Sequence, residues 1–481
     1  TAMAEPVPGT LPTVLDDFAE GLAAAAAEHD DLCAVFRAGL AAAQTSLANT
    51  PNQLPVLKQN GVVDAGGQGF VDLLEGIDAW AERGVLDPLD ESFENEANEA
   101  EQLPDTGALE VGDHQFCTEC VIEGRDLDRL AVMQRLAKLD QSSMVVAGSD
   151  RRVRVHIHVN NPAEVFLACE DFGEITQQKA DDMRWQQGLL NLQGTVAVVT
   201  DSGADLPDSE VERLGIHVVP VRVSFGDREF LDGVSLKPKD FYRLQEESEA
   251  PPKTSQPPPR DFRRVYELLT VHGYQVMHVG LSTLLSGTTQ AAQAAAGRID
   301  EGEVRVFDTL NASCGEGLLA LAAAEAAARG MDLDDIERML ERLAPMTRTL
   351  AVVDELKSAV RGGRLPAWIG RLLTGLRLTP VIATRGGRIT VAGVRFGRGA
   401  DPATLARRVL RVLDADRTFR VMVSHADNPD GAKELRRLIL AGHPRIHYCH
   451  LAEAGPALGA HMGRKGLVVA FMPDPQELSG P

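Results

Sequence analysis

The chain contains little cysteine, no long apolar run and a deficit of positive charge. Six cysteines in 481 residues show no pattern typical of a disulfide-bonded scaffold, which fits a reducing compartment. No apolar run approaches the roughly 20 residues that a membrane-spanning helix needs, and we find no signal peptide. Lysine and arginine total 48 against 70 aspartates and glutamates, which gives a net charge of −22. This charge argues against nucleic acid and anionic membranes as main partners, so we expect a soluble cytoplasmic protein.

What is present indicates several domains. The composition is 44% hydrophobic and 25% charged, which is typical of a globular protein, and the length suggests roughly three domains. Residues 1–87 are rich in alanine, with apolar residues three and four positions apart. This spacing predicts amphipathic helices that need a partner, which a homodimer would supply. The chain begins Thr-Ala-Met inside this helical pattern, which suggests a truncation.

Three further segments follow. Residues 88–115 are acidic and poor in large apolar side chains, as in a solvated linker. Residues 116–190, the middle domain, mix strand and helix patterns and predict a small α+β domain. Residues 195–475, the C-terminal domain, alternate strands and helices, which predicts an α/β fold with a largely parallel sheet.

The C-terminal domain is organised around the buried strand Val196–Thr200 and the polar loop that follows it, which contains Asp201 and Ser202. In open α/β sheets a ligand binds beyond the carboxyl ends of the strands. A single strand is also expected at His217–Phe225, and an antiparallel hairpin arm at Arg388–Arg395.

Two hydroxyl groups in this domain lie in settings that suit an anion. Thr254 belongs to the segment PPKTSQPPP, whose prolines hold an extended loop rigid. Ser286 and Gly287 open a predicted helix, where a hydroxyl and free N–H groups can bind an anion. The alternatives are a capped helix start at Pro259 and an ordinary N-cap at Ser286.

Charged residues near glycine supply a third signal. Arg364 and Arg395 place fixed positive charge where carboxylate or phosphate recognition would use it. His461 lies between small residues that leave it accessible, although a lone histidine is usually structural.

The N-terminal part has a glycine-dense segment that contains Asp64, Gly66 and Gly67, ahead of a predicted helix at Phe70–Ala79. Glycines allow close approach of a phosphate to the backbone. The alternative is a tight helix–helix packing turn, which is the more common case because the segment is not a P-loop.

The middle domain contains the pattern Cys117-Thr118-Glu119-Cys120, followed by a strand that carries His156 and His158. On a strand these two histidines point to the same face. Thiol and imidazole groups in this number suit tetrahedral zinc, with His114 as a less favoured extra ligand. The spacing differs from that of a zinc finger, so two surface histidines and two buried thiols remain the alternative. A metal-dependent hydrolase is one function that such a site would allow.

A series of short segments between residues 195 and 475 carries a family resemblance, in this order: VVTDSGADL, PVRVSF, FLDGVSL, KTSQPPPRDF, GLSTLLSGTTQAA, FDTLNASCGEGL, RGGR, LTPVI, VAGVRF, SHAD and LGAHMG. The C-terminal domain thereby resembles the DegV family, whose members bind long-chain fatty acids. The resemblance implies an α/β domain in two lobes, with the acyl chain threaded into the core. It differs in TSQPPP, where TSQPSP is usual, and in SGTTQ, where SGTYQ is common.

The same resemblance assigns site residues. It implies that the hydroxyls of Thr254 and Ser286 hold the carboxylate, beside Gly287, with the loop of Asp201 and Ser202 in the same region. The Arg and His residues that the family places near the carboxylate correspond to Arg364, Arg395 and His461, which we expect to act on the head group.

The first 190 residues resemble the kinase subunit of fatty acid kinase, which is related to dihydroxyacetone kinase. LANTPNQLPVLKQNGVVDAGGQGFVDLLEG looks like part of its helical nucleotide-binding (DhaL) domain, and VRVHIHVNNPAEVF looks like its middle domain. The resemblance implies metal ligands at Cys117, His156 and His158, with zinc as the candidate ion. Cys120 stands where a bulky apolar residue is more usual. Asp64, Gly66 and Gly67 are weak candidates for nucleotide contact.

The two resemblances together predict a fatty acid kinase–carrier fusion that makes acyl phosphate. The aspartate cluster that binds Mg-ATP in the kinase family does not occur in this chain. We therefore expect Mg-ATP binding only with the missing N-terminal half present, and no phosphorylation by this chain alone. A separate kinase or acyltransferase is an expected partner. The alternative is a lipid-binding protein whose N-terminal part is only a scaffold or dimerisation module.

Overall fold

The computed structural model describes residues 7–54, 57–58, 62–83, 114–188, 195–353, 378–396 and 400–478. The chain divides into two compact units, residues 1–114 with 141–147 and residues 115–140 with 148–481. Arg364 and nearly all of the expected linker lie outside the described residues. Within the described ranges, no helix is both long and apolar enough to cross a lipid bilayer.

The first unit contains the predicted amphipathic helices, α1 (Leu11–Ala26), α2 (Leu32–Gln53) and α4 (Ala65–Arg83), and the strand β2 (Gln141–Gly148). The helices bury a shared apolar core that includes Val14, Leu47 and Val71. Helix α4 begins earlier than the periodicity predicts because the Asp64 carboxylate accepts a hydrogen bond from the Gly67 N–H at 2.7 Å. The glycine-dense segment is therefore the first turn of a helix and not a loop.

The middle domain has the predicted mixture of strands and helices: β1 (Phe116–Glu123), α6 (Arg129–Leu136), β3 (Arg152–Val159), α7 (Pro162–Glu170), β4 (Glu174–Asp182) and α8 (Met183–Gly188). Strand β1 pairs antiparallel with β3 on one side and with β4 on the other. Strand β3 alternates buried and more exposed positions, as expected for a sheet with one covered face.

The first lobe of the C-terminal domain contains a four-stranded parallel sheet in the order β11-β10-β5-β6. Its strands are β5 (Val196–Asp201), β6 (His217–Val219), β10 (Gln275–Gly280) and β11 (Val304–Asp308). Its helices are α9 (Asp208–Leu214), α10 (Pro238–Glu247), α11 (Pro259–Val271), α12 (Thr288–Ala296), α13 (Cys314–Ala328) and α14 (Leu333–Leu343). The predicted parallel sheet is confirmed for this lobe.

A small antiparallel sheet, β8-β7-β9, adjoins this lobe. It consists of β7 (Arg222–Phe225), β8 (Arg228–Leu231) and β9 (Lys253–Ser255). The expected single strand His217–Phe225 is wrong, because the chain leaves the parallel sheet after β6 and enters this second sheet as β7. The break falls at Pro220, which has no N–H to continue a ladder.

The second lobe is a six-stranded sheet in the order β14-β13-β12-β17-β15-β16. Its strands are β12 (Arg348–Val352), β13 (Leu378–Arg385), β14 (Arg388–Phe396), β15 (Phe419–His425), β16 (Ile446–Glu453) and β17 (Leu467–Pro473), and its helices are α17 (Pro402–Leu410), α18 (Pro429–Gly442) and α19 (Pro456–Met462). Only β15 and β16 pair in parallel, so the expectation of a largely parallel sheet is wrong here. The hairpin arm β13–β14 is confirmed: Gly386 and Gly387 both have positive φ, as the two central residues of a type I′ hairpin turn do.

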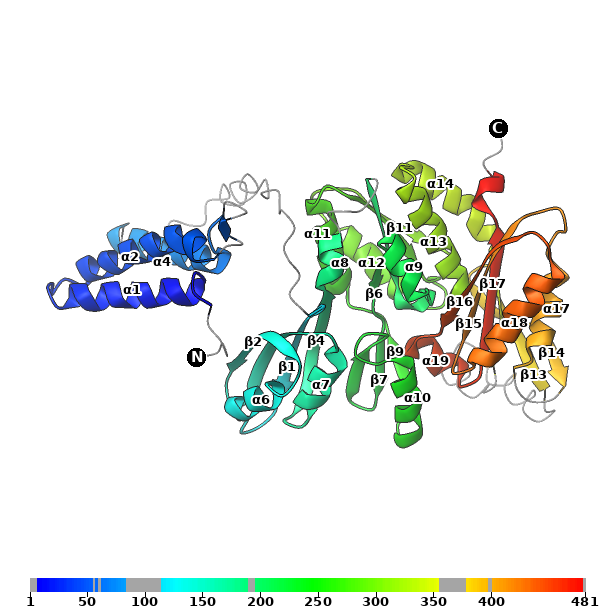
Figure 1. Ribbon diagram of the computed structural model, residues 1–481, viewed down its shortest axis with the longest axis horizontal. Coiled ribbons are helices and arrows are strands. Elements are labelled where there is room, and N and C mark those ends of the chain that lie inside the picture. Colours follow the sequence, from blue (N-terminus) through cyan, green and yellow to red (C-terminus); the bar gives the residue numbers. More distant parts are fainter. Residues whose placement is uncertain are drawn as a thin grey trace. The chain divides into compact units, whose positions relative to one another are not determined.

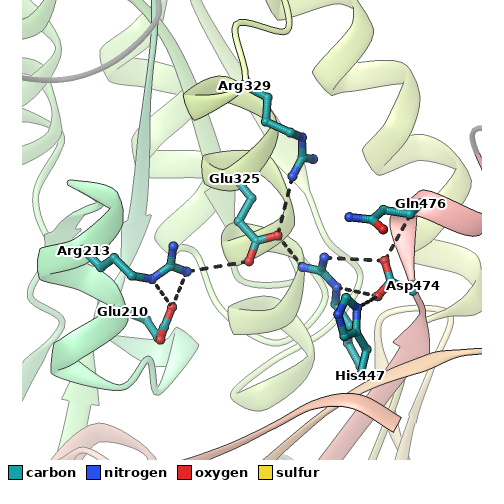
Figure 2. A network of polar contacts seen from close by, with 8 residues as sticks. Glu210, Arg213, Glu325, Arg329, His447, Asp474 and Gln476 are labelled. Atoms are coloured by element: carbon teal, nitrogen blue, oxygen red, sulfur yellow. Dashed lines mark hydrogen bonds and ion pairs between the residues drawn. The ribbon is translucent and has the colours of Figure 1, made fainter. Parts of the chain in front are cut away.

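Helix α13 joins the two lobes. It is buried on nearly all sides and contacts β5 and β10 of the parallel sheet as well as β12, β15 and β17 of the six-stranded sheet (Figure 1). A helix that is apolar all round needs such burial on every face. Glu325, near the C-terminal end of α13, forms ion pairs with both lobes (Figure 2). Its carboxylate lies 2.5 Å from the guanidinium of the buried Arg420 of β15 and 3.7 Å from the guanidinium of Arg213 of α9. Arg420 in turn lies 3.3 Å from Asp474, after β17.

Candidate functional site

An apolar pocket lies between the edge of the parallel sheet and a face of the six-stranded sheet. Strand β12 supplies alternate residues to its wall, Thr349 and Ala351, and Val353 follows. The hairpin β13–β14, helix α19 and the loop before α12 add most of the remaining apolar wall, including Ile382, Ile389, Leu458, Met462, Leu281 and Leu285. A pocket of this composition suits the hydrocarbon part of a ligand.

A second, more open depression adjoins the apolar pocket. Thr254, Ser286, Val221 and Leu285 line both of them. The depression is otherwise lined by Ser255, Gln256, Thr283, Leu284 and Gly287, a more polar set. The two expected carboxylate-binding hydroxyls, Thr254 and Ser286, therefore lie where an apolar interior meets an open polar mouth.

Tertiary folding brings Thr254 together with His461, 207 positions away. The Thr254 Oγ1 and the His461 Nε2 are 2.8 Å apart and hydrogen-bonded. Thr254 is held in β9, opposite Val223 of β7, and His461 lies near the end of α19. The Ser286 Oγ is hydrogen-bonded to the Thr288 Oγ1 at 2.8 Å and also accepts from the Thr288 N–H at 3.3 Å. The N-cap of α12 is Gly287, so the alternative that Ser286 is the N-cap is wrong. Ser286 lies one residue earlier, contacts the first residue of the helix and lines the pocket.

Gly287 has a steric role at the mouth. A Cβ at this position would lie 1.8 Å from the Gln256 Oε1. The absence of a side chain therefore allows the Gln256 amide to lie against the backbone that opens α12. Sequence reasoning did not single out Gln256, although it belongs to the SQPPP segment.

The loop after β5 supports the pocket wall and does not present its polar side chains there. Asp201 is fully buried, and its carboxylate accepts hydrogen bonds from the N–H groups of Gly203 at 2.9 Å and Leu281 at 3.4 Å. The Ser202 Oγ donates to the Asp232 carboxylate at 2.6 Å and accepts from the Val221 N–H. Of this loop only Gly203 lines the pocket.

Four buried carboxyl groups lie behind that loop, and sequence reasoning missed three of them. Burial raises the pKa of Asp201 to about 6 and the pKa values of Asp205 and Asp232 to about 7, because desolvation disfavours the charged form. Burial also raises the pKa of Glu316 well above its usual value, and the nearby carboxyl groups of Asp201 and Asp205 raise it further.

The hydrogen bonds to these carboxyls come from neutral donors on separate segments. Asp205 accepts from the Ser313 Oγ at 2.5 Å and from the Gly455 N–H at 3.0 Å. Asp232 accepts from the Ala457 N–H at 3.2 Å. The cluster joins the loop after β5, the start of α13 and the start of α19. The signal in the sequence was a single acidic residue among small and apolar ones, Asp232 inside FLDGVSL and Glu316 inside CGEGL.

Comparison with known proteins fits this architecture. Residues 195–474 match the family model described as "Uncharacterised protein, DegV family". The chain belongs to the DegV family. Curated relatives include a DegV domain-containing protein of Deinococcus radiodurans, 31% identical over 281 residues that cover 58% of this chain and 99% of the relative. Protein DegV of Bacillus subtilis is 30% identical over 284 residues, covering 57% of this chain and 98% of the relative.

Solved DegV structures are similar to the same part of the chain. One, described as fatty acid binding of a DegV family protein from Thermus thermophilus, is 31% identical with a TM-score of 0.54, and covers 58% of this chain and 99% of that protein. DegV of Bacillus subtilis, described as a fatty acid binding protein, is 28% identical with a TM-score of 0.52, and covers 59% and 100%. Ahead of the DegV domain, residues 113–189 match a middle domain of the fatty acid kinase type, and residues 1–79 match a DAK2 domain.

Of the two expected arginines, Arg395 lies in the described residues and does not line the DegV pocket or its mouth. Arg395 of β14 lies 3.6 Å from Asp401, which precedes α17. Arg364 lies outside the described residues. In the described part of the DegV domain, no lysine or arginine lines the pocket or the open depression. The polar groups at the mouth are hydroxyls, one imidazole and one amide.

The candidate metal ligands of the middle domain do come together. Cys117, His156 and His158 each offer an atom, and all three atoms lie within 4.8 Å of one another. The Cys117 Sγ and the His156 Nδ1 are 3.8 Å apart. Two such ligands on one tetrahedral zinc, at about 2.3 and 2.1 Å from the ion, lie roughly 3.6 Å apart. The residues present therefore fit this ion.

Cys120 lies away from these ligands. Successive side chains of a strand point to opposite faces, so Cys117 and Cys120, three positions apart on β1, face opposite sides of the sheet. Cys120 is buried and interacts with Cys169. The His114 Nδ1 lies 2.9 Å from the Ser142 Oγ, and His114 does not belong to the ligand cluster.

The glycines of α4 have a packing role in the structure. A Cβ on Gly66 would lie 3.3 Å from the Cβ of Leu11, and one on Gly67 would lie 3.1 Å from Leu47 and Val14. With the Asp64 cap, this supports the helix-packing alternative. The suggestion that Asp64, Gly66 and Gly67 contact a nucleotide stays a prediction.

Proposed function

We propose that this chain binds a long-chain fatty acid, with the acyl tail in the apolar pocket and the carboxylate at Thr254 and Ser286. The observation that carries the proposal is the position of these two hydroxyls, at the boundary between an apolar interior and an open polar mouth. The relatives described as fatty acid binding support it. His461 would hold the Thr254 hydroxyl in place for the head group.

The energetics favour this division of the ligand. Burying an acyl chain contributes about 0.8 kcal/mol per CH₂, so ten buried methylenes contribute roughly 8 kcal/mol. The carboxylate keeps access to the open depression, where hydroxyls and backbone N–H groups can replace part of its hydration. Asp201, Ser202 and Gly287 would shape this head-group region, and the carboxylate of Asp201 would not contact the ligand.

The binding proposal is tested by measuring the affinity for palmitate. A hydrogen bond to a charged group contributes about 1.5–3 kcal/mol, so Thr254→Val and Ser286→Ala should each weaken binding about ten- to hundredfold. Thr390→Val is a matched control, because this half-buried threonine of β14 does not line the pocket. Unchanged palmitate affinity in the Thr254→Val, Ser286→Ala double variant would overturn the proposal. Mass spectrometry of lipid extracted from the purified protein would identify the natural ligand.

We further propose that the bound fatty acid is presented for phosphorylation to acyl phosphate, as in a fatty acid kinase–carrier fusion. The match of residues 113–189 to a middle domain of the fatty acid kinase type supports this step. Arg364, Arg395 and His461 would act on the phosphoryl group as it moves, which is mainly positioning and electrostatic stabilisation. Because Arg395 contacts Asp401, it would have to leave that partner to do so.

The kinase step is tested by ADP release from ATP in the presence of palmitate. We expect none from this chain alone, and release when a separate fatty acid kinase is added. Release by the chain alone would show that it contains its own Mg-ATP site. No release in either case, with palmitate bound, would favour a lipid-binding protein whose N-terminal part is only a scaffold.

We also propose that Cys117, His156 and His158 bind zinc, on the support of their spacing. The ion would supply a cross-link between β1 and β3. Burial raises the pKa of the Cys117 thiol to about 11, so zinc must displace a firmly held proton and its affinity should increase with pH.

A further inference from the structure

The middle domain contacts the DegV domain at the sheet that carries Thr254. Gln178 of β4 is 5% exposed, and both ends of its amide are used across this contact. Its Nε2 donates to the Glu229 carbonyl, and its Oε1 accepts from the Ser235 Oγ at 3.4 Å. Glu229 and Ser235 belong to β8 and to the turn after it. A buried amide with partners on both ends fixes the position of the two strands.

The same contact reaches β7 through Arg222. Its guanidinium is almost fully buried, with Nη1 3.5 Å from the Gln178 carbonyl oxygen and 3.2 Å from the Glu229 carboxylate. Its Nη2 donates to the Asp261 carboxylate at 2.6 Å. In the ladder, Arg222 lies opposite Ser255, the residue after Thr254. Arg222 therefore links β4 of the middle domain, the β7–β9 pair and the first turn of α11.

A second connection fastens α11 itself. The Asp181 carboxylate of β4 lies 2.9 Å from the Arg264 guanidinium of α11 and 3.0 Å from the Lys179 ammonium. Only Gln256, Pro257 and Pro258 separate the end of β9 from α11, which begins at Pro259. Because proline fixes φ, little slack exists between α11 and Thr254.

An aromatic anchor holds the two domains in this arrangement. The Trp185 Nε1 donates to the Gly215 carbonyl at 3.3 Å, and its ring lies 4.1 Å from that of His217. Trp185 also packs against the buried cluster of the DegV domain that contains Phe262 and Tyr266 of α11. The middle domain therefore contacts α11 in two ways: Asp181 pairs with Arg264, and Trp185 packs against the cluster that contains Phe262 and Tyr266.

We propose that Asp181 of the middle domain is a positioning residue for the fatty-acid site, which it sets by holding α11 and, through the short proline-rich connection, the strand β9 that carries Thr254. The inference rests on the proposed binding function. It makes the middle domain part of the ligand-binding unit, beyond any role in a kinase. Removing the Asp181–Arg264 ion pair frees the strand that carries Thr254 to shift, although Asp181 does not line the pocket.

The test measures palmitate affinity in the full chain. Asp181→Asn, or Arg264→Gln from the other side of the same ion pair, should weaken binding by at least about fivefold. The control is Arg228→Gln, which breaks a bidentate pair with Glu170 between the same two domains but touches neither β9 nor α11. It should leave palmitate affinity unchanged.

A positioning role has a signature that general destabilisation lacks. If Asp181 acts through Thr254, Asp181→Asn should add little to the loss that Thr254→Val already causes. The charge-exchanged pair Asp181→Arg with Arg264→Asp should recover binding. Unchanged palmitate affinity in both Asp181→Asn and Arg264→Gln would overturn the inference while leaving the binding function intact. The inference would also be overturned if the affinity lost in Asp181→Asn added in full to the affinity lost in Thr254→Val. Failure of the unmodified chain to bind palmitate would overturn the binding function itself.

Discussion

The buried acids behind the pocket predict an unusual pH dependence of stability. An acid whose pKa is raised in the folded state binds a proton there that the unfolded state has already released. The resulting stability is complete below the unfolded pKa of 3.8 and is lost as the pH rises through the folded pKa. For Asp205 and Asp232 the folded pKa is about 7. Their contribution should therefore decrease between about pH 4 and pH 7.

The size of the effect follows from the shift. The pKa of Asp205 moves from 3.8 to about 7, and each unit corresponds to about 1.36 kcal/mol, so roughly 4 kcal/mol is lost across this range. Asparagine resembles the protonated acid, since its amide can accept from the Gly455 N–H and donate to the Ser313 Oγ. Asp205→Asn should not lose this stability. Relative to the unmodified chain, the variant should gain about 4 kcal/mol between pH 4 and pH 8.

The measurement is urea unfolding of both proteins at several pH values, monitored by a signal from the DegV domain. Asp240→Asn provides the control, because it is the same chemical change at a half-exposed aspartate outside this cluster. Asp232→Asn should behave like Asp205→Asn. A difference between Asp205→Asn and the unmodified chain that is constant from pH 4 to pH 8 would refute the assignment of raised pKa values to this cluster.

Three further predictions concern other parts of the molecule. Cys117→Ser should abolish binding of one zinc per chain in metal analysis, whereas Cys120→Ser should retain it, and equal retention would exclude the proposed ligand set. Gly287→Ala should weaken palmitate binding, because the added Cβ would displace the Gln256 amide from the mouth; unchanged affinity would show that the amide has no part in the site. Arg420→Met should lower the free energy of unfolding by about 3–5 kcal/mol, because it leaves the Glu325 and Asp474 carboxylates without their buried cation. Unchanged stability in urea unfolding would contradict this.

Local patterns in the sequence predicted much of the architecture. Apolar spacing located the N-terminal helices, and alternating strand and helix patterns predicted the mixed structure of the segments that follow. The period of two along a strand was enough to place His156 and His158 on one face, beside Cys117. Such patterns are readable because burial and backbone preference act within a few residues of each other.

The antiparallel second lobe could not be predicted in the same way. Strands of either orientation carry similar apolar runs, and the pairing partner is chosen by distant segments. The break at Pro220 was visible as a proline, but its consequence, the move of β7 into another sheet, depends on β8 and β9.

The sequence by itself determined which residue types are available for the proposed fatty-acid site: two hydroxyls in rigid settings, a histidine between small residues and a polar loop after the strand that begins the domain. Only the tertiary structure decided their geometry. It joined Thr254 to His461 across 207 positions, directed Arg395 to Asp401 and placed Asp205 and Asp232 where water is excluded. Contacts and desolvation between segments far apart in the chain leave no local pattern, because each side chain's neighbours are set by how the whole domain packs.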